Sequence, residues 1–391
     1  MSAAPAYLDH AATTPVRPEV VEAMLPYLGA TFGNPSSSHA FGRAARVGLE
    51  QARREVAEAI GAEPGEVYFT SGGTEADNLA VLGRALAARA AGAPFGVAVA
   101  ATEHKAVLAA AHAVVQLGGR EQLLPVDAEG TLDRATFTTV LGTRPAVVSV
   151  MWVNNETGVV QPVTELAAAA AAAGVPFHTD MVQAFGKLPV TLAGTPVALA
   201  SISGHKLGAP KGIGALVVRR GTTIAPLVTG GSQQRGLRPG TENLAGAVAL
   251  GRAAILARAE AAGEHARLTG LRSRLLAGLR DAVPDLVVVA EGAVTAPHVL
   301  AVLVPGTEST VLLMHLDRLG VAASGGSACS SGATEPSHVL AAMGLPPALA
   351  RGLVRLSLGH GSTEADVAAT IAAFPEAVSR ARQLTGALSH G

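Results

Sequence analysis

The middle of this 391-residue chain alternates short runs of β-branched and other apolar residues with longer stretches rich in alanine and leucine. Near-continuous apolar strands separated by helices are typical of a largely parallel sheet covered on both faces. The strand candidates are residues 67–70, 97–100, 146–150, 175–178, 199–202 and 214–218. This alternation predicts an α/β fold.

The pattern changes after Gly240. A helical stretch over residues 244–262 continues through 268–279, followed by β-like runs at 286–289 and 300–304 and a final helix near 364–380. This order predicts a smaller α+β domain joined to the first by a helix, with the break near residues 257–263. We therefore expect a large domain over residues 15–259 and a small domain built from residues 1–14 and 260–391.

Charge and cysteine content narrow the function classes. The 29 basic and 30 acidic residues give a net charge of -1, and neither sign forms a long block, so the sequence does not favour direct nucleic-acid binding or an anionic membrane surface. No secretory signal and no run of 18 apolar residues stands out. The single cysteine permits neither an internal disulfide nor a Cys-rich zinc site, and we expect a cytoplasmic protein without a metal centre.

Polar side chains follow several of the predicted strands. In open α/β sheets, ligands bind beyond the carboxyl ends of the strands. The residues in such positions are Ser71 to Asn78, His104, Asn154, Asn155, Asp180, Gln183 and Ser203 to Lys206. Their placement predicts a binding site at one edge of the sheet.

The segment from Ser71 to Asn78 follows a predicted strand and opens a predicted helix, so its backbone N–H groups and the Thr74 hydroxyl can face an anion at the positive helix end. A tight turn with a capping hydroxyl and Glu75 in the first helical turn is the simpler alternative for this segment taken alone. It is not a P-loop, because the Gly-Lys-Ser/Thr ending is absent.

Two further strand ends carry groups of a different chemistry. Lys206 closes Ser-Gly-His-Lys, and a lysine delivered into a cleft can form a Schiff base. Asp180 ends the preceding strand, where a buried carboxylate can pair with a pyridinium nitrogen. For each residue taken singly, the simpler alternatives are a surface lysine for Lys206 and a helix N-cap for Asp180. A phosphate cradle, a strand-end Asp and a strand-end Lys in this order suggest pyridoxal phosphate.

Cys329 lies within a run of small residues, Ser324 to Gly332. Because no large side chain there anchors it in a core, we expect a thiol on a mobile loop. From this segment alone, a chemical role and an incidental thiol are about equally supported.

Taken together, these stretches resemble the cysteine desulfurases of the NifS/IscS type, in the class V aminotransferase family of fold-type I pyridoxal-phosphate enzymes. The resemblance implies a large domain with a mostly parallel seven-stranded sheet and a smaller α+β domain. The small residues around Cys329 resemble the group of this family with the longer mobile loop. The matching stretches span nearly the whole chain: residues 7–15, 32–36, 70–78, 102–107, 153–158, 203–206, 238–241, 324–330 and 355–359.

Carried over by position, the resemblance implies a cofactor site. Lys206 would hold pyridoxal 5'-phosphate covalently, and Asp180 would pair with the ring nitrogen. His104 would stack on the ring and shuttle protons, and Gln183 would hydrogen-bond the phenolic oxygen. The residues implied around the phosphate are Gly73, Thr74, Ser203, His205 and, from the second subunit of a homodimer, Thr241.

The resemblance also implies a substrate and a reaction. Asn155 and Arg355 would bind the carboxylate of L-cysteine, a task for which the fork of an arginine is suited. The Cys329 thiolate would take the substrate sulfur as a persulfide and leave L-alanine. Acceptors in this family are iron–sulfur scaffolds, tRNA-thiolating enzymes and other sulfur carriers.

Two positions depart from the commonest family pattern: Met181, where a small residue usually follows the Asp, and Gln234, where a Glu is usual. Met181 is expected to alter packing beside the ring. The alternatives are a selenocysteine lyase or another class V enzyme, in which Cys329 is incidental, and a non-catalytic scaffold. Five residues present together argue against the scaffold, which would need none of them: Lys206, Asp180, His104, Cys329 and Arg355.

Overall fold

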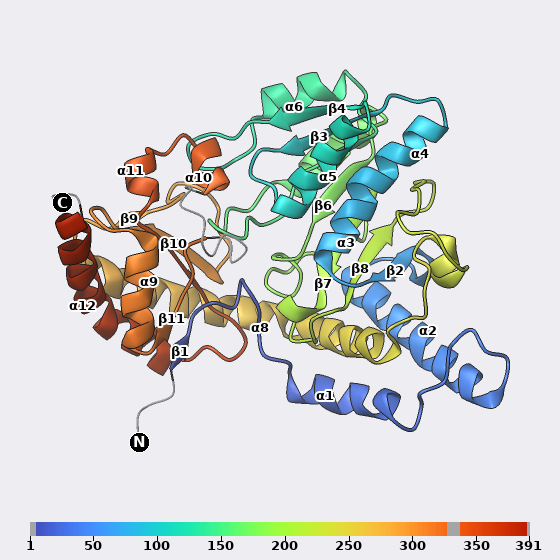
Figure 1. The fold of residues 1–391 in the computed structure, drawn as a ribbon, viewed down its shortest axis with the longest axis horizontal. Helices are drawn as coiled ribbons and strands as arrows, with labels where there is room; N and C mark the ends of the chain where they lie inside the picture. Colours follow the sequence, from blue (N-terminus) through green and yellow to red (C-terminus); the bar gives the residue numbers. More distant parts are fainter. Residues whose placement is uncertain (1–4, 327–336, 389–391) are drawn as a thin grey trace.

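The computed structural model describes residues 5–326 and 337–388, and it is built around a seven-stranded sheet of order β2-β8-β7-β6-β5-β3-β4 (Figure 1). Five neighbouring strands, β7 to β4 in this order, are parallel. The strands are β2 (Val67–Thr70), β3 (Gly96–Ala100), β4 (Arg120–Leu124), β5 (Val147–Ser149), β6 (Phe177–Asp180), β7 (Leu199–Ser203) and β8 (Gly214–Val218). The predicted α/β fold with a mostly parallel sheet is confirmed.

Only β8 runs against its neighbours, so β2 on its far side points the same way as β7. The register makes this explicit, because Thr70 at the end of β2 and Ser203 at the end of β7 both pair with Gly214 at the start of β8. The carboxyl ends of six strands therefore meet at one edge of the sheet, which is where ligands bind in such folds.

Helices cover both faces of this sheet, as Figure 1 shows. Alternation along β3 explains how: Ala98 and Ala100 join one hydrophobic core, whereas Val97 and Val99 join another on the opposite face. The first core is completed by α2 (Ala40–Ile60), α6 (Arg134–Leu141), α7 (Val163–Ala172) and the start of α8 (Leu244–Ala282). The second is completed by α3 (Gly73–Asn78), α4 (Arg84–Ala90) and α5 (Lys105–Gln116).

A smaller α+β part lies at one end of the molecule, and the N-terminal strand belongs to it (Figure 1). Its antiparallel sheet has the order β12-β10-β9, and β1 pairs in parallel with β11. The strands are β1 (Ala6–Tyr7), β9 (Val287–Val288), β10 (Val299–Leu303), β11 (Val321–Ala322) and β12 (Leu353–Ser357). The helices are α9 (Ser309–Arg318), α10 (His338–Ala342), α11 (Pro347–Ala350) and α12 (Glu364–Leu388).

Helix α8 joins the two parts and runs without interruption through the residues where a break was expected. Most of its buried side chains up to Ala257 belong to the core of the large sheet, and those from Leu268 onward belong to the core of the small part. The division of the chain after residue 259 stays a prediction.

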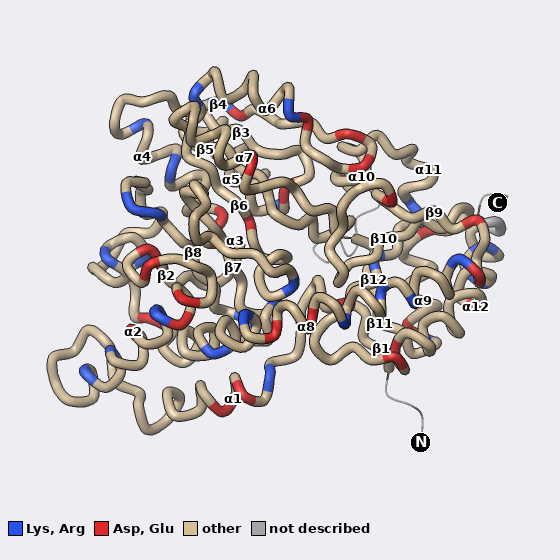
Figure 2. The backbone as a smooth tube through the Cα atoms, turned by 180° about the vertical axis from the view of Figure 1, so that it is seen from behind, with Lys and Arg blue, Asp and Glu red and all other residues tan. Residues whose placement is uncertain are grey.

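Charges of both signs are interspersed along the chain, and several lie close together where α8 crosses between the two parts (Figure 2). Helix α1 (Pro18–Met24) packs beside α8 in this region. Within residues 5–326 and 337–388, no helix combines the length and the apolar character that a membrane crossing requires.

Candidate active site

A cavity of about 420 Å³ lies at the carboxyl edge of the large sheet. Its wall brings together ten of the residues singled out in the sequence: Gly73, Thr74, His104, Asn155, Asp180, Gln183, Ser203, His205, Lys206 and Arg355. They come from the ends of β2, β6 and β7, from the start of α5, from the loop after β5 and from β12. Residues that span most of the chain therefore converge on one site.

Lys206 reaches the cavity from a short 3₁₀ turn, η4 (Gly204–Lys206), that begins where β7 ends. Its Nζ donates hydrogen bonds to the carbonyl oxygens of Ala11, at 2.6 Å, and Ala12, at 2.5 Å. These two backbone acceptors were not expected from the sequence, since alanines in a loop give no chemical signal. The N-terminal segment thus fixes the amine within the cavity.

Asp180 ends β6 and is almost fully buried. One carboxylate oxygen accepts from the Val182 backbone N–H at 2.8 Å. Burial raises the pKa of this carboxyl, and the nearby His104 and Lys206 oppose that rise. The residues that directly follow Asp180 form a turn and not a helix, so the helix-cap alternative is wrong. A buried carboxylate of this kind favours a cationic partner.

His104 lies where β3 leads into α5 and caps that helix, because its Nδ1 accepts from the Ala106 N–H at 3.2 Å. Burial lowers the pKa of the His104 imidazole, with Asp180 opposing and Lys206 reinforcing the effect. A neutral ring whose Nδ1 is already an acceptor carries its proton on Nε2, and that tautomer follows from the hydrogen bond.

Gly73 begins α3 beside Ser203, and this local geometry leaves room for an anion. A methyl group on Gly73 would lie 3.1 Å from Val182 Cγ2 and 3.4 Å from Ser203 Cβ, so a larger residue would fill this part of the cavity. His205 is held by a 3.1 Å hydrogen bond between its Nδ1 and Thr13 Oγ1, and burial lowers its pKa to about 4. A neutral His205 can still donate one hydrogen bond to a phosphate oxygen, although it adds no positive charge to the site.

The simpler alternative for the 71–78 turn also holds in part. Glu75 accepts from the Ser71 N–H at 2.7 Å and pairs with Arg238 at 2.9 Å, so it stabilises the turn itself.

Thr241, three residues beyond Arg238, is exposed and does not line the cavity of its own chain.

Arg355 enters from the small part, in the middle of β12, and is 1% exposed. Its guanidinium donates to Asp9 at 2.8 Å and to the carbonyl oxygen of Asn155 at 2.8 Å, while its buried Nε meets no acceptor among the described residues. Asn155 therefore orients Arg355 through its backbone, a role that its side-chain chemistry did not suggest.

Gln183 is buried and donates to the Ala11 carbonyl at 2.9 Å. Its Oε1 lies 3.2 Å from Nε2 of His298, which is buried. His298 thus supports a residue of the cavity wall.

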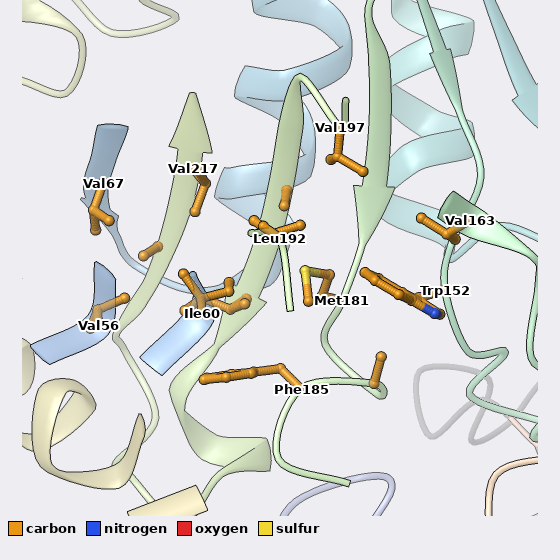
Figure 3. Close-up of a cluster of buried hydrophobic side chains, with 14 of the residues drawn as sticks. Val56, Ile60, Val67, Trp152, Val163, Met181, Phe185, Leu192, Val197 and Val217 are labelled. Atoms are coloured by element: carbon orange, nitrogen blue, oxygen red, sulfur yellow. The ribbon is translucent and has the colours of Figure 1, made fainter. Parts of the chain in front are cut away.

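Met181 does not face the cavity, which corrects the expectation that it alters packing beside a cofactor ring. It is fully buried in the core of the large sheet, near Phe185 and Leu192 (Figure 3). The methionine that does line the cavity is Met151, in the loop after β5. Successive side chains along a strand point to opposite faces, so Asp180 lies in the cavity wall while Met181 lies in the hydrophobic core.

Gln234 lies outside the cavity wall and has a structural role. It adopts a left-handed backbone conformation with φ of 46°, and its Oε1 accepts from the Arg53 side chain and the Phe69 N–H, each at 3.0 Å. The amide thereby links β2 to α2, as a glutamate oxygen at the same place also could.

Two further buried carboxyl groups, Asp77 and Glu103, lie near Asp180, and Asp77 also lines the cavity. Burial and the charge of Asp180 raise the pKa values of Asp77 and Glu103. His178, fully buried, lies between the hydroxyls of Ser149 at 2.8 Å and Ser201 at 3.0 Å. Asp77 falls within the predicted 71–78 segment, as the fifth residue of α3, whereas Glu103 was not singled out as a site residue.

Cys329 falls within residues 327–336, outside the described residues. The two described flanks of that segment meet one carboxylate: Ser337 Oγ donates to Glu156 Oε2, and a methyl group on Gly326 would lie 2.9 Å from the same oxygen. Glu156 directly follows Asn155 of the cavity wall. The described residues on either side, Gly326 and Ser337, thus lie next to the residue that follows Asn155 of the cavity wall.

The residues present fit pyridoxal phosphate. A lysine amine, a buried carboxylate with a raised pKa and a glycine cradle beside Ser203 line a single cavity. Together they offer a covalent anchor, a partner for a pyridinium and a place for a phosphate.

Comparisons with known proteins agree with this site. The family model for aminotransferase class-V matches residues 6–370. A cysteine desulfurase of Cereibacter sphaeroides is 46% identical over 381 residues, covering 97% of each chain. The cysteine desulfurase NifS of Azotobacter vinelandii is 42% identical over 380 residues, covering 97% of this chain and 94% of the relative.

Among solved structures, a NifS-like protein superimposes with a TM-score of 0.89 at 32% identity, covering 96% of this chain and 99% of the other. Members of the class V aminotransferase family, cysteine desulfurases included, are pyridoxal-phosphate enzymes. The shared sequence extends over the large sheet, the small part and the strand that bears Arg355. The chain belongs to the class V aminotransferase family and, within it, to the cysteine desulfurases of the NifS/IscS type.

Proposed function

We propose that this protein is a pyridoxal 5'-phosphate-dependent cysteine desulfurase that converts L-cysteine to L-alanine and transfers the sulfur to Cys329. The observation that carries the proposal is the convergence of Lys206, Asp180, His104 and Arg355 on one cavity. The names of the relatives support the same reaction.

The cofactor would be held by residues of the large sheet. Lys206 would bind it covalently, Asp180 would face the ring nitrogen, and Gly73, Thr74 and Ser203 would surround the phosphate. When bound, pyridoxal phosphate supplies an electron sink for carbanions next to the amino group. A cationic ring nitrogen would offset the desolvation that raises the pKa of Asp180, so the ionised carboxylate becomes the stable form.

The substrate carboxylate would be bound by Arg355. Its Nε lacks a described acceptor while the rest of the guanidinium is held by Asp9 and Asn155, so the side chain is oriented before substrate arrives. A substrate held in this way would have its Cα between the Lys206 and Arg355 sides of the cavity.

Proton transfer would use the two bases of the cavity. The Lys206 amine can accept the proton from the substrate Cα, and the neutral His104 imidazole can exchange a proton with the substrate thiol. The Cys329 thiolate then attacks the substrate sulfur: an S–S bond forms, the C–S bond breaks and its electron pair stays with the carbon skeleton. A proton delivered to Cβ and the proton returned to Cα by Lys206 complete alanine. The persulfide on Cys329 leaves the cavity to meet an acceptor.

Several further features belong to the proposal. Thr241 of the partner subunit would complete the phosphate site of a homodimer, consistent with its exposure in its own chain. The sulfur would pass to an acceptor protein for iron–sulfur cluster assembly or for thiolation of tRNA or a cofactor. A cytoplasmic location remains the expectation for this chemistry.

The direct test is turnover of L-cysteine by the purified protein in the presence of a reductant. We expect alanine and sulfide in equal amounts, together with the yellow colour of the bound cofactor. Turnover of selenocysteine but not of cysteine would replace the proposal with a selenocysteine lyase, and a colourless protein that turns over neither would make it a non-catalytic scaffold.

A further inference from the structure

A second cavity, of about 140 Å³, lies between the N-terminal segment, the loop after β6, helix α8 and the loop after β12. None of the residues that line it lines the larger cavity. Its ionisable residues are His10, Arg17, Lys187, Glu260, Glu264 and His360, and much of the remaining wall is apolar. The proposed cysteine desulfurase activity assigns no role to this cavity.

The two carboxylates of this cavity are already paired. Arg17 donates two hydrogen bonds to Glu260, at 2.7 and 2.8 Å. Arg267 likewise donates two to Glu264, at 2.8 and 2.9 Å. Bidentate pairs of this kind hold both charges in fixed geometry.

Because both carboxylates are paired with arginines, the positive charge of Lys187 has no carboxylate of its own in this cavity. Lys187 is 8% exposed, and no described residue accepts a hydrogen bond from its Nζ or forms an ion pair with it. Burial lowers the pKa of Lys187, Glu264 opposes the shift, and Arg17 and Arg267 add to it. A buried ammonium without a partner is costly, and an anion beside it relieves that cost.

The choice of lysine at this position is itself informative. The sequence contains four lysines against 25 arginines. Lys206 and Lys211 line the larger cavity, and Lys187 lines the smaller one. In a chain so dominated by arginine, lysines occur mainly where a compact amine faces a cavity.

We propose that the second cavity is a binding site for a small monocarboxylate, whose carboxylate pairs with Lys187 Nζ. The short apolar tail lies against Pro15, Val16, Leu207 and Ala257 of the wall. A cavity of this size holds on the order of six non-hydrogen atoms, as a benzene-sized cavity does. A zwitterionic amino acid is disfavoured, because Glu260 and Glu264 are engaged and cannot take an ammonium without breaking an existing pair.

The first test is competitive acetylation of the holoenzyme by a short pulse of acetic anhydride, with the extent at each lysine read by peptide mass spectrometry. Propionate is the probe, and sodium chloride at the same ionic strength is the control. At about ten times its Kd, propionate should slow acetylation of Lys187 about tenfold while exposed Lys105 reacts as before. Unchanged acetylation of Lys187, or equal protection by chloride, would overturn the proposal.

The second test is titration calorimetry of propionate and of L-alanine. Saturable heat should appear for propionate in the wild-type protein and in Lys105→Met, and disappear in Lys187→Met. Binding of propionate by Lys187→Met as in the wild type, or tighter binding of L-alanine than of propionate, contradicts the site. If Lys187→Met fails to fold, the acetylation experiment on the wild-type protein decides. Neither readout depends on turnover of cysteine, so the proposed activity and this site fail separately.

Discussion

The active-site cavity has two walls that are built in different ways. On the large-sheet side, Asp180 and Lys206 each stand just beyond the end of a strand, where side chains are free to converge. On the small side, Arg355 stands in the middle of β12 and reaches the cavity only because Asp9 and Asn155 hold it there. The first wall follows from topology, whereas the second follows from specific contacts.

This difference separates the kinds of damage that mutations should cause. Loss of a strand-end group should remove chemistry and leave the fold in place. Loss of a contact that holds the second wall should weaken substrate binding. Loss of a residue that points away from the cavity should affect stability alone.

The largest effect is expected for Lys206→Ala. Removal of the amine should lower turnover of L-cysteine by about 10²–10⁴-fold or more, because both the covalent anchor and a proton acceptor are lost. Alanine formation measures the rate, and the visible absorbance after reconstitution measures the anchor. Lys105→Ala, outside the cavity wall, is the matched control. Near-normal alanine formation by Lys206→Ala would remove this residue from the mechanism.

Met181→Ala tests whether the residue after Asp180 belongs to the core and not to the site. Because Met181 is fully buried, its truncation should cost about 2–5 kcal/mol of unfolding free energy while KM for cysteine stays unchanged. Urea unfolding and steady-state kinetics give the two values. Met314→Ala, on the surface of α9, should change stability by about 0.5 kcal/mol or less. A raised KM for cysteine without a loss of stability would show that Met181 contributes to the cavity and not to the core.

Arg355→Lys probes the second wall while retaining the positive charge. Loss of the fork should raise KM for L-cysteine about 10- to 100-fold, since a charge-assisted hydrogen bond contributes about 1.5–3 kcal/mol. Cysteamine, which has no carboxylate, should react at the same low rate with both proteins. If the substitution slows cysteamine as strongly as cysteine, Arg355 acts on the fold of the site and not on the carboxylate.

The smallest effect concerns His178 behind the large-sheet wall. Burial lowers its pKa from 6.5 to about 3, so the folded state binds fewer protons than the unfolded state between these values, and stability falls as pH falls from about 7 toward 3. His178 alone should account for about 2 kcal/mol of the loss between pH 7 and pH 5.

His178→Asn should therefore show a flatter dependence of unfolding free energy on pH than the wild type. His112→Asn is the control, because His112 is largely exposed. Equal slopes for His178→Asn and the wild type would show that His178 does not titrate on unfolding.

The two walls also differ in how far the sequence could predict them. Apolar strands followed by polar residues predicted the large sheet, the edge that carries the site and most of the residues there. Strand β4 was missed because its Arg-Glu-Gln start is polar and it lies at the sheet edge. Strand β6 begins two residues later than expected, just after Pro176, which lacks a backbone donor.

The wall formed by the small part could not be predicted from hydrophobic patterns in the sequence. Strand β12 was not predicted, and Arg355 was identified only through the resemblance to the family. Its partners, the Asp9 carboxylate and the Asn155 carbonyl, are separated from it by 346 and 200 residues. The hydrogen bonds from Lys206 to the carbonyl oxygens of Ala11 and Ala12 could not be predicted either, because every residue has a backbone carbonyl and the residue type gives no signal.

The central claim is that sulfur passes through Cys329, and one measurement addresses it directly. The wild-type protein is mixed with L-cysteine, quenched with an alkylating agent and digested, and the Cys329 peptide is analysed by mass spectrometry beside the alanine formed in the first turnover. The account predicts one additional sulfur atom on this peptide in an amount equal to the alanine, and loss of both alanine and sulfide in Cys329→Ala. Alanine and sulfide released in full by Cys329→Ala, with no added sulfur on the wild-type peptide, would contradict it.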